Sequence, residues 1–597
     1  MYRTHTCGQL TGKNAGEAIV LSGWVNKVRN LGGMTFIDLR DRYGITQVTY
    51  DPSRHTFPLP DLKSEYVVKI SGTVVARPDS MINKDMPTGE IEISPTAIEV
   101  LSDCKELPFP VDHEAPVGED IRLEYRYLDL RRQTMKENII ARHKIFTETI
   151  KFFDEENFLH IETPAFVKNT PEGSREFVVP ARFEPGKFFV LPQSPQQQKQ
   201  MLMVAGMDKY VQIARCFRDE DPRGDRQPEF TQVDFEMSFV EQQDVLDITE
   251  KYFLAVSKNI FPHKTIVQEK FPIYTWEQMM NDYGSDKPEL RTKEFTFKDL
   301  TDRAKKTDFS LFQQAAVVKA IALPKALSRS EADKYETFVK QYGSKGLAWL
   351  SMTSEGLKGT VAKFITPEVL AELPGKGEGE WTLLFQIGER EDVVKYLGML
   401  RTKLLQDFNV LKGKENEVSF AFVVDFPLFE LGNDGSLGAV HHPFTKPKDE
   451  DIPFVKALGK KLREGGNMTD EEKTKLLAIK ADCYDLIFNG NEAGGGSIRI
   501  YDKELQHAIF SLLGLSDKQI QERFGHLLKC FEYGVPPHGG CAFGLDRMVM
   551  LYQNMENIRE VIAFPKNQKY RDLMIDAPGQ IDENLLKELG LAVIKKE

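Results

Sequence analysis

Short runs of alternating apolar and polar residues fill the first hundred positions of the chain. Five runs, each bounded by Gly, Pro, Asn or Asp, are typical of short β-strands: 17–28, 33–41, 44–50, 66–76 and 89–100. Five short strands in so small a region predict a β-barrel, and the OB-fold is a five-stranded barrel that binds oligonucleotides on one face. An ordinary solvated β face that binds no ligand is an equally good explanation of these strands.

Prolines separate this region from the rest of the chain. Each proline of LPFPVDHEAP (107–116) blocks a helix or strand, so we expect a linker there. Apolar residues then recur at helical spacing from Ile139 to Phe153, including Phe146 and Ile150, and predict a long helix. Four arginines form a cluster before this helix: Arg122, Arg126, Arg131 and Arg132. Such a cluster either binds a phosphate or, more commonly in proteins, lies on a solvated helix face.

The pattern changes again between residues 287 and 418, where we expect an inserted domain. Helical segments rich in Lys and Glu (297–306 and 328–343) alternate with apolar strand patterns (317–324 and 380–387). A polar turn is expected at 375–380. Strand patterns return at 419–430, 440–447 and 484–500, and the tail from 566 is predicted to be a loop plus one helix over 584–596.

Composition narrows the function classes. The chain has 597 residues, of which 41% are hydrophobic and 28% charged, which argues against disorder, collagen and coiled coil. Its 78 basic and 90 acidic residues give a net charge of −12, so a nucleic acid must be bound by local patches rather than by a global positive field.

Cysteine usage and the absence of long apolar runs bear on location. The six cysteines form no C-x-x-C pair, so neither a zinc knuckle nor a secreted disulfide framework is indicated. The start of the chain has no apolar stretch typical of a signal peptide, and no run of about 18 apolar residues occurs. We therefore expect a cytoplasmic protein with no membrane partner.

The most informative stretch is VQIARCFRDEDPRGDRQPEFTQVDFEMSF (211–239), in which two strand-like runs flank a polar loop. Arg218 at a strand end offers a planar fork of donors to a phosphate. Phe230 offers a stacking surface for a base, and nearby carboxylates accept hydrogen bonds from an exocyclic amine. Taken alone, these residues are better explained as a charged hairpin loop with local ion pairs.

The order F-R-D-E, loop, Q-P-E-F-T-Q-V-D-F-E resembles motif two of the class II aminoacyl-tRNA synthetases, which holds ATP. GGCAFGLDRMVML (539–551) resembles motif three, whose arginine contacts the terminal phosphate. There Gly544 lets the backbone approach a ligand, and Arg547 lies at a helix start that favours anions. NFLHIETPAF (157–166) resembles motif one, whose proline, here Pro164, lies at the dimer interface.

Further stretches are similar to the aspartyl-tRNA synthetases of the bacterial type: 170–180, 191–200, 439–447, 489–500 and 536–547. The resemblance covers essentially the whole chain. It implies a multidomain α+β fold with an N-terminal OB-fold β-barrel, an antiparallel-sheet catalytic domain and an inserted α/β domain. The implied domains follow one another along the chain. They are an OB-fold anticodon-binding domain (1–106), a hinge (107–136), the first catalytic part (137–286), an inserted domain (287–418), the second catalytic part (419–565) and a C-terminal extension (566–597).

The resemblance also implies an activity, an ATP-dependent ligation of L-aspartate to its tRNA through aspartyl-adenylate. The implied catalytic residues are Arg218, which neutralises the α-phosphate, and Arg547, which neutralises the γ-phosphate. The implied Mg²⁺ ligands are Asp485 and Glu492. The implied L-aspartate ligands are Glu172, Gln196, Lys199, Arg218, Asp234, His441 and Arg499. The implied ATP ligands are Arg218, Asp219, Glu220, Gln227, Phe230, Glu492, Gly544, Leu545, Asp546 and Arg547.

The partners implied are the aspartate tRNA and a second copy of the chain. In the barrel, Phe36 is expected to stack on a splayed base, while Arg29, Gln47 and Glu92 contact base edges, as recognition of single-stranded RNA requires. Leu31 resembles the form restricted to the aspartate tRNA, whereas relaxed enzymes of the family tend to carry histidine there.

Alternatives remain at the level of the residues. Alone, Lys199 is better explained as an exposed helix lysine, His441 and His442 as loop histidines, and Asp485 and Glu492 as acids around an Asn-Gly turn. A lysyl-tRNA synthetase would need acids in place of Lys199 and Arg499. An asparaginyl enzyme is disfavoured by the insertion, and a general single-strand-binding OB protein leaves most of the chain unexplained. A catalytically silent relative is expected to lack some of the proposed substrate-binding residues. The ones that discriminate are Arg218, Glu220, Glu492, Arg499 and Arg547.

Overall fold

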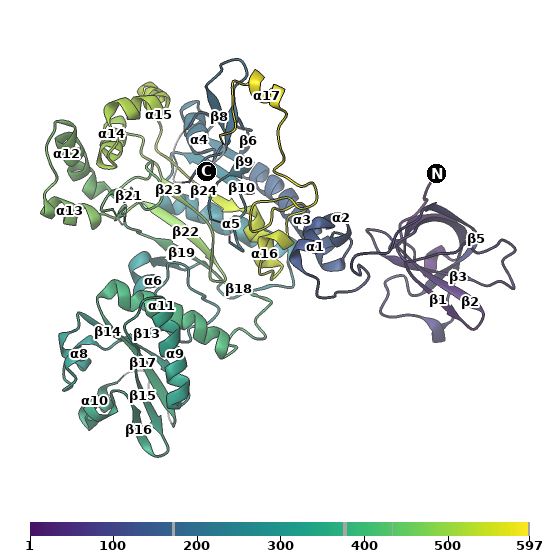
Figure 1. Ribbon diagram of the computed structural model, residues 1–597, viewed down its shortest axis with the longest axis horizontal. Coiled ribbons are helices and arrows are strands. Elements are labelled where there is room, and N and C mark those ends of the chain that lie inside the picture. The colour runs from purple at the N-terminus through teal and green to yellow at the C-terminus, as the bar shows by residue number, and fades with distance from the viewer. Residues whose placement is uncertain (170–173, 222, 374–378, 433, 595–597) are drawn as a thin grey trace. The chain divides into compact units, whose positions relative to one another are not determined.

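The computed structural model describes residues 1–169, 174–221, 223–373, 379–432 and 434–594 (Figure 1). It divides into two compact units, one of residues 1–137 with 572–577 and one of the remainder, which are described separately. Among the described residues, none of the helices is both long and apolar enough to cross a membrane.

The first unit contains a closed five-stranded barrel in the order β1-β2-β3-β5-β4, with β3 and β5 parallel and the other pairs antiparallel (Figure 1). Alternate residues such as Leu21, Val25 and Ile37 fill its core. The five predicted strands and the barrel are confirmed. Their bounds are β1 (Ala18–Leu31), β2 (Met34–Arg40), β3 (Ile45–Tyr50), β4 (Val67–Ala76) and β5 (Ile91–Ser102).

The arginine cluster lies in and after two short helices, α1 (Glu119–Glu124) and α2 (Arg126–Asp129). Neither sequence interpretation of it was right, because the cluster is an internal ion-pair network. Arg122, Arg126 and Arg132 surround the fully buried carboxylate of Asp129, and Arg131 contacts the buried Glu65. Between β5 and α1 the chain forms no helix or strand, as the prolines predict.

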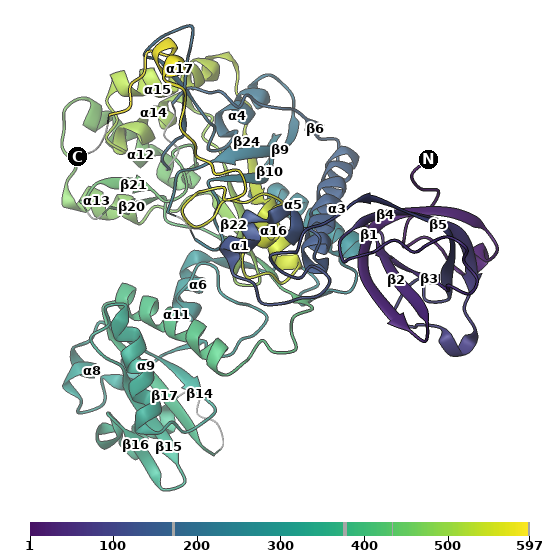
Figure 2. The same ribbon diagram turned by 45° about the vertical axis from the view of Figure 1, so that its right-hand side comes forward.

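The second unit is built on an eight-stranded sheet, whose inner strands are antiparallel and whose outermost pairs are parallel (Figures 1 and 2). In order across the sheet these are β12 (Ile273–Thr275), β19 (Phe420–Val424), β22 (Cys483–Phe488), β23 (Asn491–Ile498), β24 (His538–Gly544), β10 (Glu229–Ser238), β9 (Lys209–Phe217) and β6 (Leu159–His160).

The two faces of this sheet differ because side chains alternate along a strand. Val233, Phe235 and Met237 of β10 enter the main hydrophobic core, which also contains side chains of α3 (Gln133–Glu155), α5 (Gln242–Ile260) and α16 (Leu545–Tyr552). The residues between them, Asp234 and Glu236, are polar and lie on the other face. Helices α3, α5 and α16 therefore cover the apolar face of the sheet, and the opposite face presents Asp234 and Glu236.

Further elements surround the sheet. They are β7 (Val178–Pro180), β8 (Phe188–Val190), α4 (Gln196–Val204), β11 (Thr265–Ile266), α6 (Trp276–Tyr283), β18 (Glu417–Val418), β20 (Phe429–Leu431), β21 (Leu437–Ala439), α12 (Ile452–Arg463), α13 (Asp470–Leu477), α14 (Lys503–Leu512) and α15 (Asp517–Cys530).

The strand predicted at 440–447 is wrong. This stretch is a loop that pairs only through isolated bridges, at Thr445 with Arg499 and at Pro447 with Ala481. Its prolines lack the N–H that a ladder needs, and so they end the pairing.

The insertion forms its own five-stranded sheet, β13 (Phe297–Asp299), β14 (Val317–Leu323), β17 (Trp381–Gly388), β15 (Ala348–Thr353) and β16 (Gly356–Gly359). Its helices are α7 (Thr301–Ala304), α8 (Ser310–Gln314), α9 (Arg329–Gln341), α10 (Pro367–Glu372) and α11 (Arg390–Asp407). The α/β character is confirmed, but the helix predicted over 297–306 begins as β13, because buried Phe297 pairs with β14. Most of the polar turn at 375–380 lies outside the described residues.

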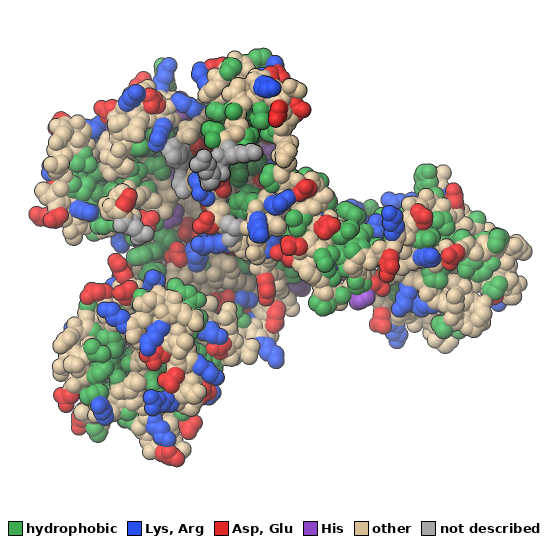
Figure 3. Space-filling view, in the orientation of Figure 1, with side chains coloured by type: hydrophobic (Ala, Val, Ile, Leu, Met, Phe, Trp, Pro, Cys, Tyr) green, Lys and Arg blue, Asp and Glu red, His purple; other side chains and the backbone are tan. Residues whose placement is uncertain are grey.

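The predicted C-terminal helix is shorter than the pattern suggested. It spans only α17 (Glu583–Glu588), and Gly590 follows in a left-handed conformation that ends it. On the visible face of the molecule, basic and acidic side chains are interspersed (Figure 3), in keeping with the modest net charge.

Candidate active site

The polar face of the eight-stranded sheet forms a cleft of about 850 Å³. It brings together residues that the sequence places hundreds of positions apart: Gln196, Lys199, Arg218, Asp219, Glu220, Gln227, Phe230, Asp234, His441, Asp485, Glu492, Arg499, Gly544, Asp546 and Arg547. Two predicted residues do not join them. Leu545 is buried in the hydrophobic core instead, and Glu172 lies outside the described residues.

Four charged side chains at one end of the cleft are almost completely buried. Lys199 places its Nζ 2.7 Å from Asp234 Oδ1 and 3.0 Å from Glu236 Oε2. Arg499 donates to both oxygens of Glu236, from Nε at 2.9 Å and from Nη2 at 3.1 Å. Glu236 is therefore ion-paired with both Lys199 and Arg499. Sequence reasoning missed it, although its place two residues after Asp234 on one strand predicts that both face the same side.

The two carboxylates behave differently. Burial raises the pKa of Asp234, an effect that Lys199 opposes. Burial acts the same way on Glu236, but Arg499 and Lys199 overcome it and lower the pKa of Glu236 to about 2. Among the described residues, Asp234 Oδ2 and Gln196 Nε2 have no hydrogen-bond partner although both are buried. Buried polar atoms are normally paired, so this end of the cleft has a donor and an acceptor free for a ligand.

The adjacent histidines face different partners. His442 Nε2 accepts from Arg499 Nη1 at 2.7 Å, and burial together with Arg499 lowers the pKa of His442 well below its ordinary value. His441 Nε2 lies 3.2 Å from Asp485 Oδ1. Burial opposes its protonation, but Cys483 and Asp485 raise the pKa of His441 well above the ordinary value. Both rings line the cleft, unlike ordinary loop histidines.

The other end of the cleft is more exposed. Arg218 donates from Nε to Gln193 O at 3.2 Å, and its guanidinium carbon lies 5.1 Å from the centroid of the Phe230 ring. Glu220 forms an ion pair with Arg226, and its side chain is 26% exposed. These two residues belong to the connection between β9 and β10, which is the polar loop that the sequence singled out.

Arg547 reaches the same end from the start of α16. It donates from Nη1 to Glu492 O at 2.6 Å and from Nη2 to Asp225 Oδ2 at 3.0 Å. Asp225 was missed because nothing in a charged loop indicates which acid turns inward. The preceding Asp546 is buried and accepts from Thr231 N at 2.9 Å and from Arg142. Its carboxylate ties α16 to β10.

Asp485 of β22 and Glu492 of β23 lie on neighbouring strands. Burial, with Glu492 nearby, raises the pKa of Asp485. Lys287, at the start of the insertion, places Nζ 3.4 Å from Glu492 Oε2. Within the described part of the chain, His, Cys, Asp and Glu form no group of three or more that could hold a metal alone. Two carboxylates nevertheless fit Mg²⁺, which takes one or two from a protein and completes its shell with substrate phosphates and water.

The glycine run 494–496 of β23 carries no side chains, and Gly494 and Gly495 of this run line the cleft. A Cβ on Gly494 would lie 2.2 Å from Ala542 O, and one on Gly496 would lie 2.0 Å from Gly540 O. Such distances are impossible, so the glycine run of β23 is required by its close pairing with β24. Where Gly494 and Gly495 line it, the surface of the cleft is backbone.

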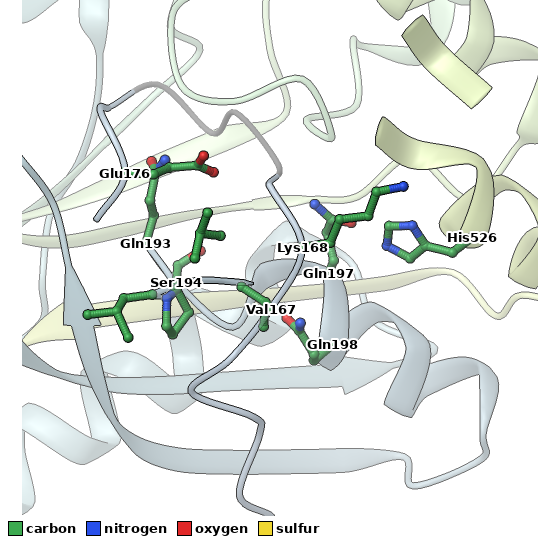
Figure 4. Close-up of a pocket in the computed structure, with 11 residues that line it drawn as sticks. Val167, Lys168, Glu176, Gln193, Ser194, Gln197, Gln198 and His526 are labelled. Atoms are coloured by element: carbon green, nitrogen blue, oxygen red, sulfur yellow. The ribbon is translucent and has the colours of Figure 1, made fainter. Parts of the chain in front are cut away.

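A wall of the cleft separates it from a pocket of about 40 Å³, shown in Figure 4. Gln193 belongs to this wall, and its side chain makes three hydrogen bonds to Ser174, of 2.8 to 3.1 Å. The pocket, which Lys168, Gln197 and His526 also line, has room for a few waters and not for a substrate.

The barrel residues predicted to contact RNA share one outer face. Arg29 pairs with Phe36 across β1 and β2, and its Nη2 donates to Gln47 Oε1 at 3.4 Å. Gln47 Nε2 donates in turn to Glu92 Oε2 at 3.2 Å. Leu31 lies at the end of β1 and is 61% exposed.

Two further barrel residues that the sequence did not single out join this face. Asp38 accepts from Arg29 Nη2 at 2.8 Å. Arg77 Nε lies 3.9 Å from Glu92 Oε2, and its Nε and Nη2 have no hydrogen-bond partner within the described residues although they are buried. The face therefore combines an aromatic ring with linked donors and acceptors.

Pro164 is exposed beside a group of exposed apolar residues. Leu159 of β6 is 52% exposed and Phe166 is 57% exposed. The helix predicted through Ile139–Phe153 is confirmed as α3, but Phe146 and Ile150, one turn apart on it, are 45% and 37% exposed rather than packed in the core. Helix α3, strand β6 and the loop after it thus each leave apolar side chains exposed.

Two family models match the chain. The model of tRNA synthetases class II (D, K and N) matches residues 118–568, and that of the OB-fold nucleic acid binding domain matches residues 19–101.

Individual relatives cover the full length. The chain is 45% identical to a protein of Porphyromonas gingivalis named aspartate–tRNA ligase, over 100% of both chains. It is 43% identical to a protein of Dictyoglomus turgidum named aspartate–tRNA(Asp/Asn) ligase, over 100% of this chain and 99% of the relative. The crystal structure of asparaginyl-tRNA synthetase from Pyrococcus horikoshii, complexed with asparaginyl-adenylate, has a TM-score of 0.58 at 16% identity, over 95% of this chain and 98% of that one.

Proposed function

The chain belongs to the class II tRNA synthetase family (D, K and N), and we propose that its cleft performs the reaction of an aspartate–tRNA ligase in two steps. In the first, L-aspartate and ATP give aspartyl-adenylate and pyrophosphate. In the second, aspartate passes to the 3′ end of its tRNA and AMP is released.

The single observation that carries this proposal is the buried pair Lys199 and Arg499, held by Glu236. A side-chain carboxylate that enters beside them gains two desolvated cations. The ammonium group of the same ligand meets Asp234, whose Oδ2 is unpartnered among the described residues, and Gln196 lies beside it. His441 and Arg218 complete this set, with Glu172, which lies outside the described residues, as the remaining proposed ligand.

Selection against asparagine follows from the same charges. The two amino acids have nearly the same shape, but the amide of asparagine is uncharged and would turn an NH₂ donor toward the donors of Lys199 and Arg499. A site built for a polar group rejects an analogue that leaves its own groups unpaired, by factors of about 10⁴–10⁵. Selection against lysine is stronger still, because its ammonium would be repelled by Lys199 and Arg499.

The exposed end is proposed to bind ATP. Arg218 would neutralise the α-phosphate and Arg547 the γ-phosphate, with the adenine stacked on Phe230. Asp219, Glu220, Gln227 and Gly544 are the further proposed ATP contacts, together with Leu545 and Asp546, whose contributions we assign to the backbone and to the placement of α16. Asp485 and Glu492 would hold Mg²⁺, which when bound neutralises and orients phosphate oxygens.

The chemistry of the first step needs little from the protein beyond positioning. The α-carboxylate of aspartate is already ionised and attacks the α-phosphorus in line, forming the C–O–P bond as the bond to pyrophosphate breaks. Arg218 and Arg547 stabilise the charge that moves onto the phosphate oxygens. In the second step the terminal tRNA hydroxyl attacks the activated carbonyl. We assign no protein base, because the adenylate phosphate accepts that proton.

We propose that the barrel binds the anticodon of the aspartate tRNA. Phe36 would stack on one base, and Arg29, Gln47 and Glu92 would contact base edges. Leu31 would restrict charging to this tRNA. The proposed domains are those expected from the sequence, in a cytoplasmic homodimer whose interface includes Pro164 and the exposed apolar side chains of α3 and β6.

The test is ATP–pyrophosphate exchange with each of the twenty amino acids, followed by charging of purified aspartate and asparagine tRNAs. Exchange with aspartate alone is expected, and charging of the aspartate tRNA alone. Charging of both would contradict the role of Leu31. No exchange with any amino acid in a folded sample would favour a catalytically silent relative.

A further inference from the structure

The connection between β9 and β10 carries proposed ATP contacts, but a distant segment holds it in place. This segment, residues 558–570, follows α16 and is here named the strap. At its start, Ile558 N donates to Gly224 O at 3.1 Å. Near its end, Gln227 Nε2 donates to Lys566 O at 2.9 Å, and Lys566 N donates to Gln227 Oε1 at 2.7 Å. The strap therefore fastens the connection at separate points.

The last of these points is a tyrosine. The hydroxyl of Tyr570 donates to the backbone carbonyl of Glu220. Burial and the nearby carboxylates of Glu220 and Asp219 raise the pKa of Tyr570, so the hydroxyl keeps its proton and remains a donor.

The backbone at Tyr570 is unusual. Its φ is +58°, in the left-handed region that tyrosine rarely adopts. A closed turn holds it there, because Tyr570 N donates to Asn567 O at 3.0 Å and Asn567 N donates to Arg571 O at 2.9 Å. Strain of this kind persists only where the surroundings enforce it, and it clusters at functional sites.

We propose that Tyr570 is a positioning residue for ATP. Its hydroxyl, with Lys566, holds the β9–β10 connection in the shape that presents Glu220 and Gln227 to the nucleotide. The inference rests on the proposed function, since it assigns a task within the ATP site. Its physical basis is preorganisation: a connection already held in its binding shape loses less conformational freedom when ATP arrives.

The experiment uses the full chain with Tyr570→Phe, which removes one hydroxyl, and Tyr533→Phe as the matched control. Tyr533 is 72% exposed and lies outside the cleft. Aspartate-dependent pyrophosphate exchange is measured with ATP and aspartate varied in turn. We expect the KM for ATP to rise about three- to tenfold, the scale of one lost hydrogen bond. The KM for aspartate, kcat and the unfolding temperature should stay close to the parent's.

Three results would overturn the inference. An unchanged KM for ATP would show that the hydroxyl positions nothing. A joint rise of both KM values with a lower unfolding temperature would show general loosening. Absence of aspartate-dependent exchange in the parent chain would overturn the proposed function first, and this inference with it.

A second variant separates strain from positioning. Tyr570→Gly relieves the left-handed backbone and also removes the hydroxyl. We expect its unfolding temperature to equal or exceed that of the parent, while the KM for ATP remains raised. A parental KM for ATP in this variant would contradict the proposal.

Discussion

The two ends of the cleft hold their charges in different ways. At the end proposed to bind the amino acid, here called the amino-acid end, the side chains of Lys199, Glu236 and Arg499 are at most 2% exposed and are paired with one another. At the end proposed to bind ATP, here called the nucleotide end, Arg547 is 24% exposed and Glu492 39%, and each is held partly through loops and backbone atoms. The first arrangement suits a rigid filter for charge. The second suits a ligand that must enter and leave as a highly charged ion.

This difference in burial predicts at which end a substitution changes stability and function together. A buried ion pair is costly to break, because the surviving partner stays desolvated. An exposed ion pair contributes little to stability, because water replaces the lost partner. Substitutions at the two ends should therefore separate effects on folding from effects on catalysis.

The largest effect is expected at Glu236. Glu236→Ala leaves Lys199 and Arg499 buried without their shared anion, so we expect a loss of about 3–5 kcal/mol in the free energy of unfolding and no detectable exchange. Urea unfolding followed by circular dichroism measures the first, with Glu471→Ala on exposed α13 as the control. Equal stability of the two variants would show that the amino-acid end is not a stability element.

The next effect is expected at Arg218. Arg218→Ala removes a proposed phosphate contact from the exposed end, so exchange should fall by at least about 100-fold. The free energy of unfolding should change by no more than about 0.5 kcal/mol. Arg329→Ala on the insertion, where the side chain is 88% exposed, is the control for loss of a charge. Near-normal exchange in Arg218→Ala would contradict the assignment of the β9–β10 connection to ATP.

A smaller and more selective effect is expected in the barrel. Phe36→Ala removes one stacking surface, worth about 1–3 kcal/mol per base, so charging should fall by about 10-fold or more. Adenylate formation should be spared, and exchange in the same preparation serves as the internal control. Equal loss of both activities would contradict a separate anticodon site.

The smallest effect concerns pH. The buried, neutral His442 beside Arg499 gains a proton only well below its ordinary pKa, and the pKa of Glu236 is about 2. Neither group therefore changes charge between pH 6 and 7, so we expect neither to make the KM for aspartate depend on pH over that interval. This KM is measured by exchange at saturating ATP. A midpoint near pH 6.5 that disappears in His442→Gln would show that His442 titrates and that this end is more open than its geometry indicates.

The predicted fold follows the sequence closely where the pattern is periodic. The five barrel strands and the strands of 211–239 were found because alternation and turn residues are local signals. The strand predicted at 440–447 failed because Pro443 and Pro447 limit pairing even where the apolar pattern is favourable. Phe146 and Ile150 show a further limit, since helical periodicity does not indicate which apolar face remains exposed.

The candidate site shows the same division. Lys199 and Arg499 were found through motifs, although nothing local in the sequence indicates that Lys199 is buried. Glu236 was missed because an acid on a strand looks the same in sequence whether it faces water or two cations. Tyr570 was missed for another reason: its contact with Glu220 joins positions 350 residues apart.

The bare backbone of the cleft at Gly494 and Gly495 has a consequence for inhibitors. A compound that lies on it touches main-chain atoms that every variant of the chain must keep, because a side chain at Gly494 would collide with β24 and one at Gly495 with Asp485. Point substitutions at these two positions are therefore not expected to give resistance to such a compound. Resistance to such a compound would have to arise at the exposed rim, where the chain tolerates change.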